Sequence, residues 1–315
     1  GVDAGALPSL LPGARRVDDA DARTAVAEVW GVPALPETPG RDVTAMLRAA
    51  ATGELAGLVV GGVDPADLPD PALARAALAE ADVVISLEQV FTEVSEHADV
   101  VLPVAPAVNR SGTYRNWEGR DRPFTTTIDP GQGGSGRVGG TAAVTLPDCR
   151  VLDSLAVEMD VDLFTQTPQA AAAELAELGT AAVTPSTPAT RAAGGTFDPA
   201  PGVRLATWRQ LLDGGSLLAE ENDLPGTARP ARLRVAPATA ERLGLTAGEP
   251  ARIGAALDLV VELADLPEDV VWAPSHVPVA GGVVTLAGLG LRHGAPVHVG
   301  PHGTGEAPHQ PGEAL

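Results

Sequence analysis

Three polar side chains in one short loop have the types and the spacing to bind a ligand. Asn116, Glu118 and Arg120 alternate along a segment that contains almost no core-like residues. The fork-shaped guanidinium of arginine and the amide of asparagine can bind a pterin or a phosphate, and Gly119 allows a backbone to approach closely. The same charged groups could instead pair with one another, or with charged neighbours, and serve only to fix a domain interface.

Two further patterns are weaker candidates. The run from Gly131 to Gly136 satisfies G-x-G-x-x-G, but no strand pattern precedes it and no helix pattern follows, so phosphate binding is not expected there. Glu93, Glu96 and His97 share a helical face and could ligate a metal, yet the H-E-x-x-H order and a distant third ligand are missing. A solvated or ion-paired helix face is favoured, and neither a catalytic residue nor a metal site is predicted. Four late histidines are expected at the surface, namely His293, His298, His302 and His309.

Short apolar runs indicate the strands that would position the loop. Val83 to Ile85 and Val100 to Leu102 are β-branched runs of the kind found in strands that are covered on both faces. The segment from Phe91 to Ala98 lies between them and is long enough for two helical turns, with Thr92 as the N-cap. The two runs are therefore expected to be neighbouring strands.

Helices alternate with strands in the first part of the chain. Leu55 to Val60 predicts another buried strand, and Gly61 with Gly62 forms a turn at its carboxyl end, where open α/β sheets bind ligands. Asp70 and Pro71 suit the N-cap and first position of a helix that leads to the next strand, which implies a parallel crossover. This order predicts a doubly wound, mostly parallel α/β layer. Helices are expected at residues 20–30, 43–52, 71–81, 148–159, 167–178 and 207–212.

The chain is expected to form two domains and a tail. Residues 1–226 carry the α/β pattern, with Gly-, Pro- and Thr-rich insertions near 125–140 and 179–202. Residues 227–300 contain closely spaced strand patterns that predict a small β-barrel. Residues 301–315 are polar and are expected to be disordered. The strands of the barrel are expected at 232–235, 251–253, 257–263, 270–273 and 296–299, with a helix at 237–243.

Composition excludes several classes of function. The net charge of −20 repels phosphate backbones, so binding to nucleic acid is not expected. No uncharged run is long enough and unbroken enough to cross a bilayer. All 21 basic residues are arginine, which removes a Walker A lysine and Schiff-base chemistry. The single cysteine, Cys149, cannot form an internal disulfide or supply an iron–sulfur cluster.

The motifs from Glu88 to Pro103 and from Gly112 to Arg120 resemble the molybdopterin oxidoreductase superfamily. In that superfamily, E-x-F-x-T-E-x-A-x-x-A-D-V-V-L-P precedes a loop written G-T-F-x-N-x-E-G-R. Within that superfamily, the sequence from Asn116 to Pro123 is most similar to the large iron–sulfur subunit (the G subunit) of bacterial respiratory complex I, the NADH-quinone oxidoreductase. The similarity is to the actinobacterial type of this subunit. The loop positions that match are Gly112, Thr113, Asn116, Glu118, Gly119 and Arg120.

The resemblance implies a molybdopterin oxidoreductase-like α/β layer followed by a double-psi β-barrel. In active relatives the matching loop lines the pterin cofactor, whereas complex I subunits look like enzymes that kept the scaffold and lost the cofactor. This chain would then be a structural, C-terminal portion without chemistry of its own. Iron–sulfur clusters would lie in a region N-terminal to it. Its partners would be other subunits of the peripheral arm, on the cytoplasmic side of the membrane, where electrons pass from NADH to quinone.

Two other functions stay open at this point. The chain could be the cofactor-clasping half of an active, formate-dehydrogenase-like molybdopterin oxidoreductase. Molybdopterin guanine dinucleotide would then lie between residues 61–64, the loop at 116–120 and the barrel. The third possibility is a binding module in which the barrel holds a small anionic metabolite.

Overall fold

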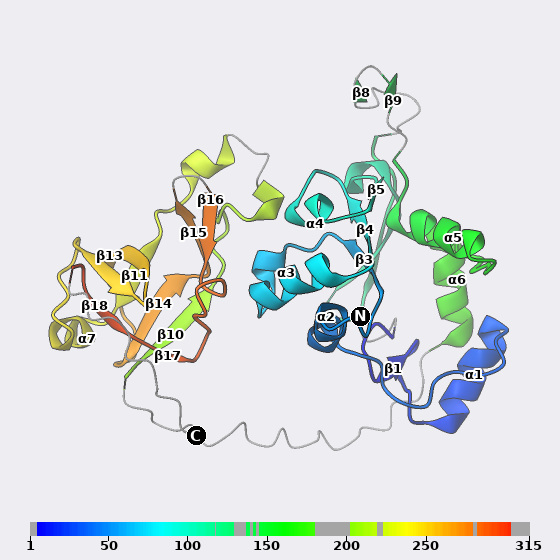
Figure 1. Ribbon diagram of the computed structural model, residues 1–315, viewed down its shortest axis with the longest axis horizontal. Helices are drawn as coiled ribbons and strands as arrows, with labels where there is room; N and C mark the ends of the chain where they lie inside the picture. The colour runs from blue at the N-terminus through cyan, green and yellow to red at the C-terminus, as the bar shows by residue number, and fades with distance from the viewer. Residues whose placement is uncertain are drawn as a thin grey trace. The chain divides into compact units, whose positions relative to one another are not determined.

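A computed structural model of the chain (Figure 1) divides it into two compact units. The first unit comprises residues 1–63 and 76–192, and the second comprises residues 64–75 and 193–315. The structure describes residues 5–116, 118–128, 137–138, 141–142, 145–179, 202–218, 223–279 and 282–303.

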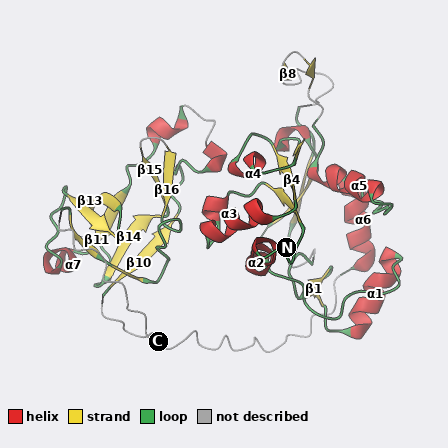
Figure 2. Ribbon diagram, viewed as in Figure 1, coloured by secondary structure: helices red, strands yellow, loops and turns green. Residues whose placement is uncertain are grey.

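A three-stranded parallel sheet forms the centre of the first unit (Figure 2). Its strands are β3 (Gly57–Gly61), β4 (Val83–Glu88) and β5 (Val100–Pro103), and β4 lies between the other two. Helix α3 (Pro71–Glu80) connects β3 to β4, and α4 (Glu93–Glu96) connects β4 to β5. The predicted parallel crossover is therefore confirmed, because β3 and β4 pair in parallel register.

Capping residues account for where the helices begin and end. Helix α1 (Ala20–Trp30) begins after Asp19, whose carboxylate accepts hydrogen bonds from two backbone N–H groups of the first turn, and ends at Gly31 with a φ of 63°. The carboxylate of Asp70 accepts from the backbone of α3 in the same way. The predictions for these helices are confirmed to within a residue or two. The remaining helices of the unit are α2 (Val43–Ala51), α5 (Asp148–Glu158) and α6 (Pro168–Leu178).

Three local expectations differ from the structure. The loop after residue 111 is mostly a hairpin, because β6 (Gly112–Arg115) pairs antiparallel with β7 (Asp121–Phe124). The helix between β4 and β5 has four residues rather than two turns, although Thr92 caps it as predicted. The helix expected at 207–212 is wrong: Thr207 belongs to β10 (Val203–Trp208), where its backbone pairs with β14. Strand pairing at a distance has overridden a local helical pattern.

Several smaller elements complete the first unit. They are β1 (Leu10–Leu11), β2 (Arg15–Arg16), η2 (Ala107–Asn109), β8 (Arg137–Val138) and β9 (Thr141–Ala142).

Some of the predictions concern residues outside the described ranges. These are the predictions for the Gly131–Gly136 motif, most of both insertions, His309 and most of the tail.

A seven-stranded mixed sheet forms the second unit, in the order β17-β10-β14-β11-β13-β12-β18. The two edge strands, β17 (Pro296–Val297) and β18 (Val299–Pro301), are consecutive in the chain. The sheet must therefore curve until its two edges almost meet, which makes it barrel-like. The other elements are η1 (Pro65–Asp67), η3 (Ser216–Leu218), η4 (Leu224–Thr227), β11 (Arg232–Val235), α7 (Pro237–Arg242), β12 (Pro250–Ile253), β13 (Leu257–Leu263), β14 (Val270–Pro274), β15 (His276–Val279) and β16 (Gly282–Thr285).

Alternating side chains fill the interior of this sheet. On β11, Leu233 and Val235 are fully buried, whereas Arg232 and Arg234 point to the other face. The same period of two recurs on β12 and β13, and one core cluster of seventeen buried residues results. The strands predicted for this region are confirmed, except that the strand expected at 296–299 is two short strands, β17 and β18, which pair at opposite edges of the sheet. None of the helices in the described residues is long and apolar enough to cross a membrane.

We expect Leu233→Ala to lower the free energy of unfolding of the barrel by about 2–5 kcal/mol, because it removes buried methyl groups and leaves a cavity. Leu263→Ala is the matched control, since Leu263 is 47% exposed at the end of β13 and its truncation should cost about 0.5 kcal/mol or less. Urea denaturation followed by tryptophan fluorescence measures both. Equal losses in the two variants would contradict this account of the core.

Candidate functional site

The residues of the candidate loop lie together at the tip of the β6–β7 hairpin. The side-chain oxygen of Asn116 accepts hydrogen bonds from the backbone N–H groups of Glu118, at 3.1 Å, and Arg120, at 2.9 Å. Gly119 has a φ of 78°, a conformation that glycine adopts without strain. The tight turn therefore depends on Asn116 and Gly119 for its shape.

The charged side chains of this tip contact one another. Arg120 Nε lies 3.3 Å from Glu118 Oε2, and Asn116 Nδ2 donates to the same oxygen at 3.4 Å. Below them, Arg115 Nε donates to Asp121 Oδ1 at 2.8 Å, and this partner lowers the pKa of Asp121. Most groups that could bind a ligand are thus used within the hairpin. Gly112 and Thr113 lie on β6 and pair with the opposite strand.

A second polar group lies at the carboxyl end of β4. Ser86 and Glu88 point to the same face of the strand, because they are two residues apart, and both are buried. Ser86 Oγ and Glu88 Oε1 have no hydrogen-bond partner among the described residues. Buried polar atoms are rarely left unpaired, so a hydrogen-bonding ligand or ordered water suits this position. The carboxyl ends of parallel strands are where α/β sheets bind ligands.

Burial raises the pKa of Glu88 above its ordinary value. The backbone N–H of Gly62 bonds to the carboxylate and opposes this shift, while the negative charge of Asp148 adds to it. Asp148 is itself paired with Arg110. The neutral form of Glu88 is therefore favoured more strongly in the folded protein than in the unfolded chain.

The other predicted candidates form no ligand set. His97 Nδ1 lies 2.9 Å from the backbone oxygen of Glu93, one turn earlier, and no cluster of metal-ligating side chains occurs in the described residues. His293 accepts a hydrogen bond from the backbone of Thr207, and His302 lies 3.1 Å from Asp258. His298 is exposed.

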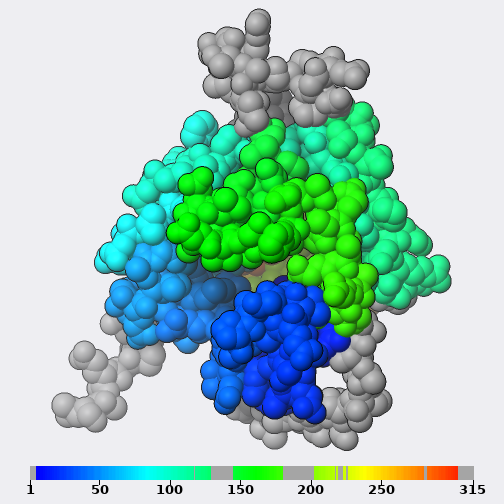
Figure 3. Space-filling view, turned by 90° about the vertical axis from the view of Figure 1, so that its right-hand side faces the viewer, coloured from blue at the N-terminus to red at the C-terminus, as the bar shows by residue number. Residues whose placement is uncertain are grey.

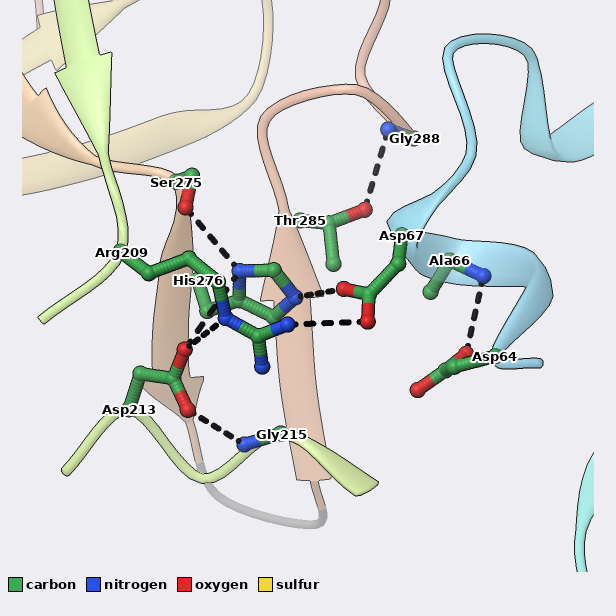
Figure 4. A network of polar contacts seen from close by, with 10 residues as sticks. All are labelled: Asp64, Ala66, Asp67, Arg209, Asp213, Gly215, Ser275, His276, Thr285 and Gly288. Atoms are coloured by element: carbon green, nitrogen blue, oxygen red, sulfur yellow. Dashed lines mark hydrogen bonds and ion pairs between the residues drawn. The ribbon is translucent and has the colours of Figure 1, made fainter. Parts of the chain in front are cut away.

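The second unit contains a network that sequence reasoning missed (Figure 4). His276 Nε2 lies 2.7 Å from Asp67 Oδ1, and Arg209 Nη1 donates to Asp67 Oδ2 at 2.9 Å. Arg209 Nε also donates to Asp213 Oδ2 at 2.6 Å, and that oxygen lies 3.8 Å from His276 Nδ1. Ser275 Oγ lies 3.1 Å from the same ring nitrogen. Two carboxylates, a guanidinium and an imidazole therefore form a closed ring of contacts.

Asp213 is the most buried member of this ring, with 4% of its surface exposed. Burial by itself would raise its pKa. The hydrogen bonds from Arg209 and from the backbone N–H of Gly215, with the charges of Arg209 and His276, outweigh burial and lower the pKa of Asp213. The carboxylate is therefore stabilised in its ionised form.

A pocket of about 420 Å³ lies beside this ring. Asp67, Arg209 and His276 line one part of it, and Arg292 with His293 lines another. The remaining lining residues are Ala66, Leu68, Pro69, Thr207, Ser275, Thr285, Leu286, Ala287 and Leu291. The charge of Arg209 is compensated by the carboxylates of Asp67 and Asp213. Among the described residues, no carboxylate is paired with Arg292, the other arginine of this lining.

No spacing in the sequence could have revealed the ring. Asp67 and His276 are 209 positions apart, and only the folded barrel brings them together. The one available signal was His276 itself, an ionisable residue inside the mostly apolar segment from Val270 to Val279. Ser86 and Glu88 carried a similar signal at the end of the run that begins at Val83.

Part of a solved enzyme has a similar fold. The chain aligns over 86% of its length with 45% of acetylene hydratase from Pelobacter acetylenicus, with a TM-score of 0.51 and 16% sequence identity. At that identity the likeness concerns the fold alone. The chain thus has a mixed α/β fold with a barrel-like sheet, as in part of that enzyme.

The sequence comparison is more specific. The chain is 41% identical over 304 residues to the G subunit of NADH-quinone oxidoreductase from Streptomyces coelicolor, which covers 95% of this chain and 35% of that subunit. The corresponding G subunit of Mycobacterium tuberculosis is 42% identical over 277 residues, 87% of this chain and 33% of that subunit. No family model matches the chain.

The chain is therefore a relative of the NADH-quinone oxidoreductase G subunit over nearly its whole length, and the resemblance stated from its motifs is confirmed. It spans about a third of the length of these curated relatives.

We expect Glu88→Gln to raise the Tm at pH 7.5 by roughly 2 °C. A raised carboxyl pKa means that ionisation costs folded-state stability, and this cost grows as the pH rises above the ordinary value of the group. The gain should disappear near pH 4, where the carboxyl is protonated in both states. Calorimetry at the two pH values checks this. Glu96→Gln, at an exposed position of α4, is the control and should change neither value; a gain at pH 4 equal to that at pH 7.5 would refute the burial argument.

We expect Asp213→Asn to lower the free energy of unfolding by about 2 kcal/mol at pH 7, because it leaves Arg209 and His276 without a buried anion. The pKa of Asp213 is lowered in the folded state, so its contribution is complete above the ordinary value and is lost as the pH falls below about 4. The difference between variant and wild type should therefore shrink with acidification. Asp269→Asn removes an exposed partner of Arg242 and should cost less than about 1 kcal/mol. Urea titrations from pH 7 to pH 3 measure both; a difference that does not depend on pH would contradict the assignment.

Proposed function

We propose that the chain is a structural portion of the large peripheral-arm subunit of an NADH-quinone oxidoreductase and carries no chemistry of its own. The observation that carries the proposal is the similarity to the G subunit over 95% of the chain. In this proposal the complex transfers electrons from NADH to quinone, and this portion supports the arm that does so. Its partners are the other subunits of the arm, at the cytoplasmic face of the membrane.

Two properties of the residues support a structural role. An iron–sulfur cluster needs several thiolates, and the sequence contains one cysteine. The clusters of the complex would then be bound by other parts of it. In addition, the polar groups of Asn116, Glu118 and Arg120 hydrogen-bond within their own hairpin, as expected of residues that fix a turn.

We infer a double-psi connection for the barrel and a vestigial role for the loop positions Gly112, Thr113, Asn116, Glu118, Gly119 and Arg120. A molybdopterin dinucleotide would require free donors and acceptors from such a loop. The contacts within the hairpin argue against that role, because they already occupy the Asn116 amide, Glu118 Oε2 and Arg120 Nε, although the Arg120 side chain is 63% exposed. Of the two arginines that line the pocket beside His276, Arg209 is already paired with two carboxylates, so only Arg292 is left to attract a small anion.

We expect Leu233→Asp to reduce strongly the amount of complex that assembles. Any complex that still assembles should oxidise NADH at the wild-type rate. A buried carboxylate would unfold the barrel, and an unfolded portion cannot support the arm. Native gel electrophoresis of membranes from the source organism, with NADH oxidation measured per assembled complex, is the test. Leu263→Asp is the control, because Leu263 is largely exposed and this variant should assemble normally.

Two outcomes would overturn the proposal. Normal assembly with the Leu233→Asp variant would show that the complex does not depend on this portion. Stoichiometric molybdenum, found by elemental mass spectrometry, together with fluorescent oxidised pterin released by acid, would instead indicate an active molybdopterin oxidoreductase.

A further inference from the structure

One face of the parallel sheet in the first unit is only half covered. Parallel sheets are normally buried on both faces, because their crossover helices pack there. Helices α3 and α4 pack on one face, where Leu78 and Val94 join Val84 in a core cluster. On the opposite face, α5 covers the carboxyl halves of the strands through Val151 and Leu155.

The amino halves of the strands on that face are exposed. Val59 is 55% exposed, Val83 is 40% exposed and Val100 is 44% exposed. Strand register places Val59 and Val100 on either side of Ile85, with Val83 two residues earlier on the same face of β4. These three valines, one from each strand, form a continuous apolar surface, which we call the valine face. The expectation that the strands at 83–85 and 100–102 are covered on both faces is therefore wrong for these residues.

The shape of the unit agrees with an uncovered surface. Figure 3 shows a hollow between the green segment that contains α5 and the blue segment that contains α1. Among the described residues, the core of this unit is also divided into three small clusters of four, three and three buried residues, whereas that of the barrel forms one cluster of seventeen. A small, divided core beside an exposed apolar sheet face indicates that packing in this unit is incomplete.

We propose that the valine face binds an amphipathic helix supplied by the part of the G-subunit polypeptide that lies outside the region matched by this chain. The proposal rests on the proposed function, because it takes the subunit as the context of the chain. The matched region makes up 35% of the Streptomyces coelicolor subunit, so in that relative about two thirds of the polypeptide accompany it. A helix of the same polypeptide is the element that normally covers a parallel sheet.

The width of the face fits a single helix. Three strands spaced about 4.8 Å apart form a strip about 10 Å wide, which is the diameter of one α-helix with its side chains. The helix should therefore present an apolar stripe to the three valines.

Cysteine labelling tests the proposal. Val59→Cys and Val83→Cys are introduced singly in a Cys149→Ser background, with Val43→Cys, at a position 51% exposed at the start of α2, as the control. Maleimide labelling rates are measured on the isolated 315-residue chain and on the native polypeptide that carries this region in membranes of the source organism. We expect labelling at Val59 and Val83 to be at least tenfold slower in the native polypeptide than in the isolated chain, and labelling at Val43 to change much less.

A second measurement needs no substitution. Carbene footprinting of the wild-type protein should modify peptides of β3 and β4 in the isolated chain and spare them in the native polypeptide. Equal reactivity in both samples would overturn the proposal, and so would a native polypeptide of only 315 residues. If the β3 and β4 peptides of the isolated chain already resist carbene modification and the chain has the mass of a dimer, the proposal is overturned. The valine face would then be covered by a second copy of the chain. Protection in a long polypeptide that does not co-purify with NADH-quinone oxidoreductase would uphold the helix and refute the proposed function alone.

Discussion

The parallel pairing of β4 with β3 and β5 is the constraint on which the first unit depends. Parallel strands need a crossover for each pairing, and they all end at the same edge of the sheet. That edge therefore collects Gly62, Glu88 and the chain that leaves β5 toward the hairpin. The valine face follows from the same pairing, because three consecutive parallel strands place apolar residues on both faces, and the described helices leave Val59, Val83 and Val100 exposed on one of them.

The barrel-like sheet of the second unit solves a different problem. Its strands alternate buried and outward residues, and its two edge strands follow one another in the chain, so one face of the sheet turns inward and forms a single apolar core. Three separate segments then meet at one end of it, through Asp67, Arg209 and His276. The cost of burying Asp213 there is offset by a guanidinium and a backbone N–H.

Local signals in the sequence predicted most of the elements, because each depends on residues that are close in the chain. Asp70 and Thr92 were identified as caps from their position alone, and the β-branched runs indicated strands. Thr207 was assigned to a helix because its pairing partner on β14 is more than sixty residues away. The ring around His276 was missed for the same reason. Its members have no common spacing, and only tertiary structure brings them together.

The two units also differ in what they need from other polypeptide. The side chains of the barrel fill its own interior, so its core does not depend on the charge of the residues that point outward. The parallel sheet leaves apolar side chains exposed and two polar atoms of β4 unpaired on the other face. The exposed valines are costly in water, and that cost is removed when further chain packs on their face. The two unpaired polar atoms are buried on the face that α3 and α4 cover, and they need a hydrogen-bonding partner there. The proposed place of this layer within a longer subunit agrees with its exposed apolar face, and the relatives that the chain matches are about three times its length.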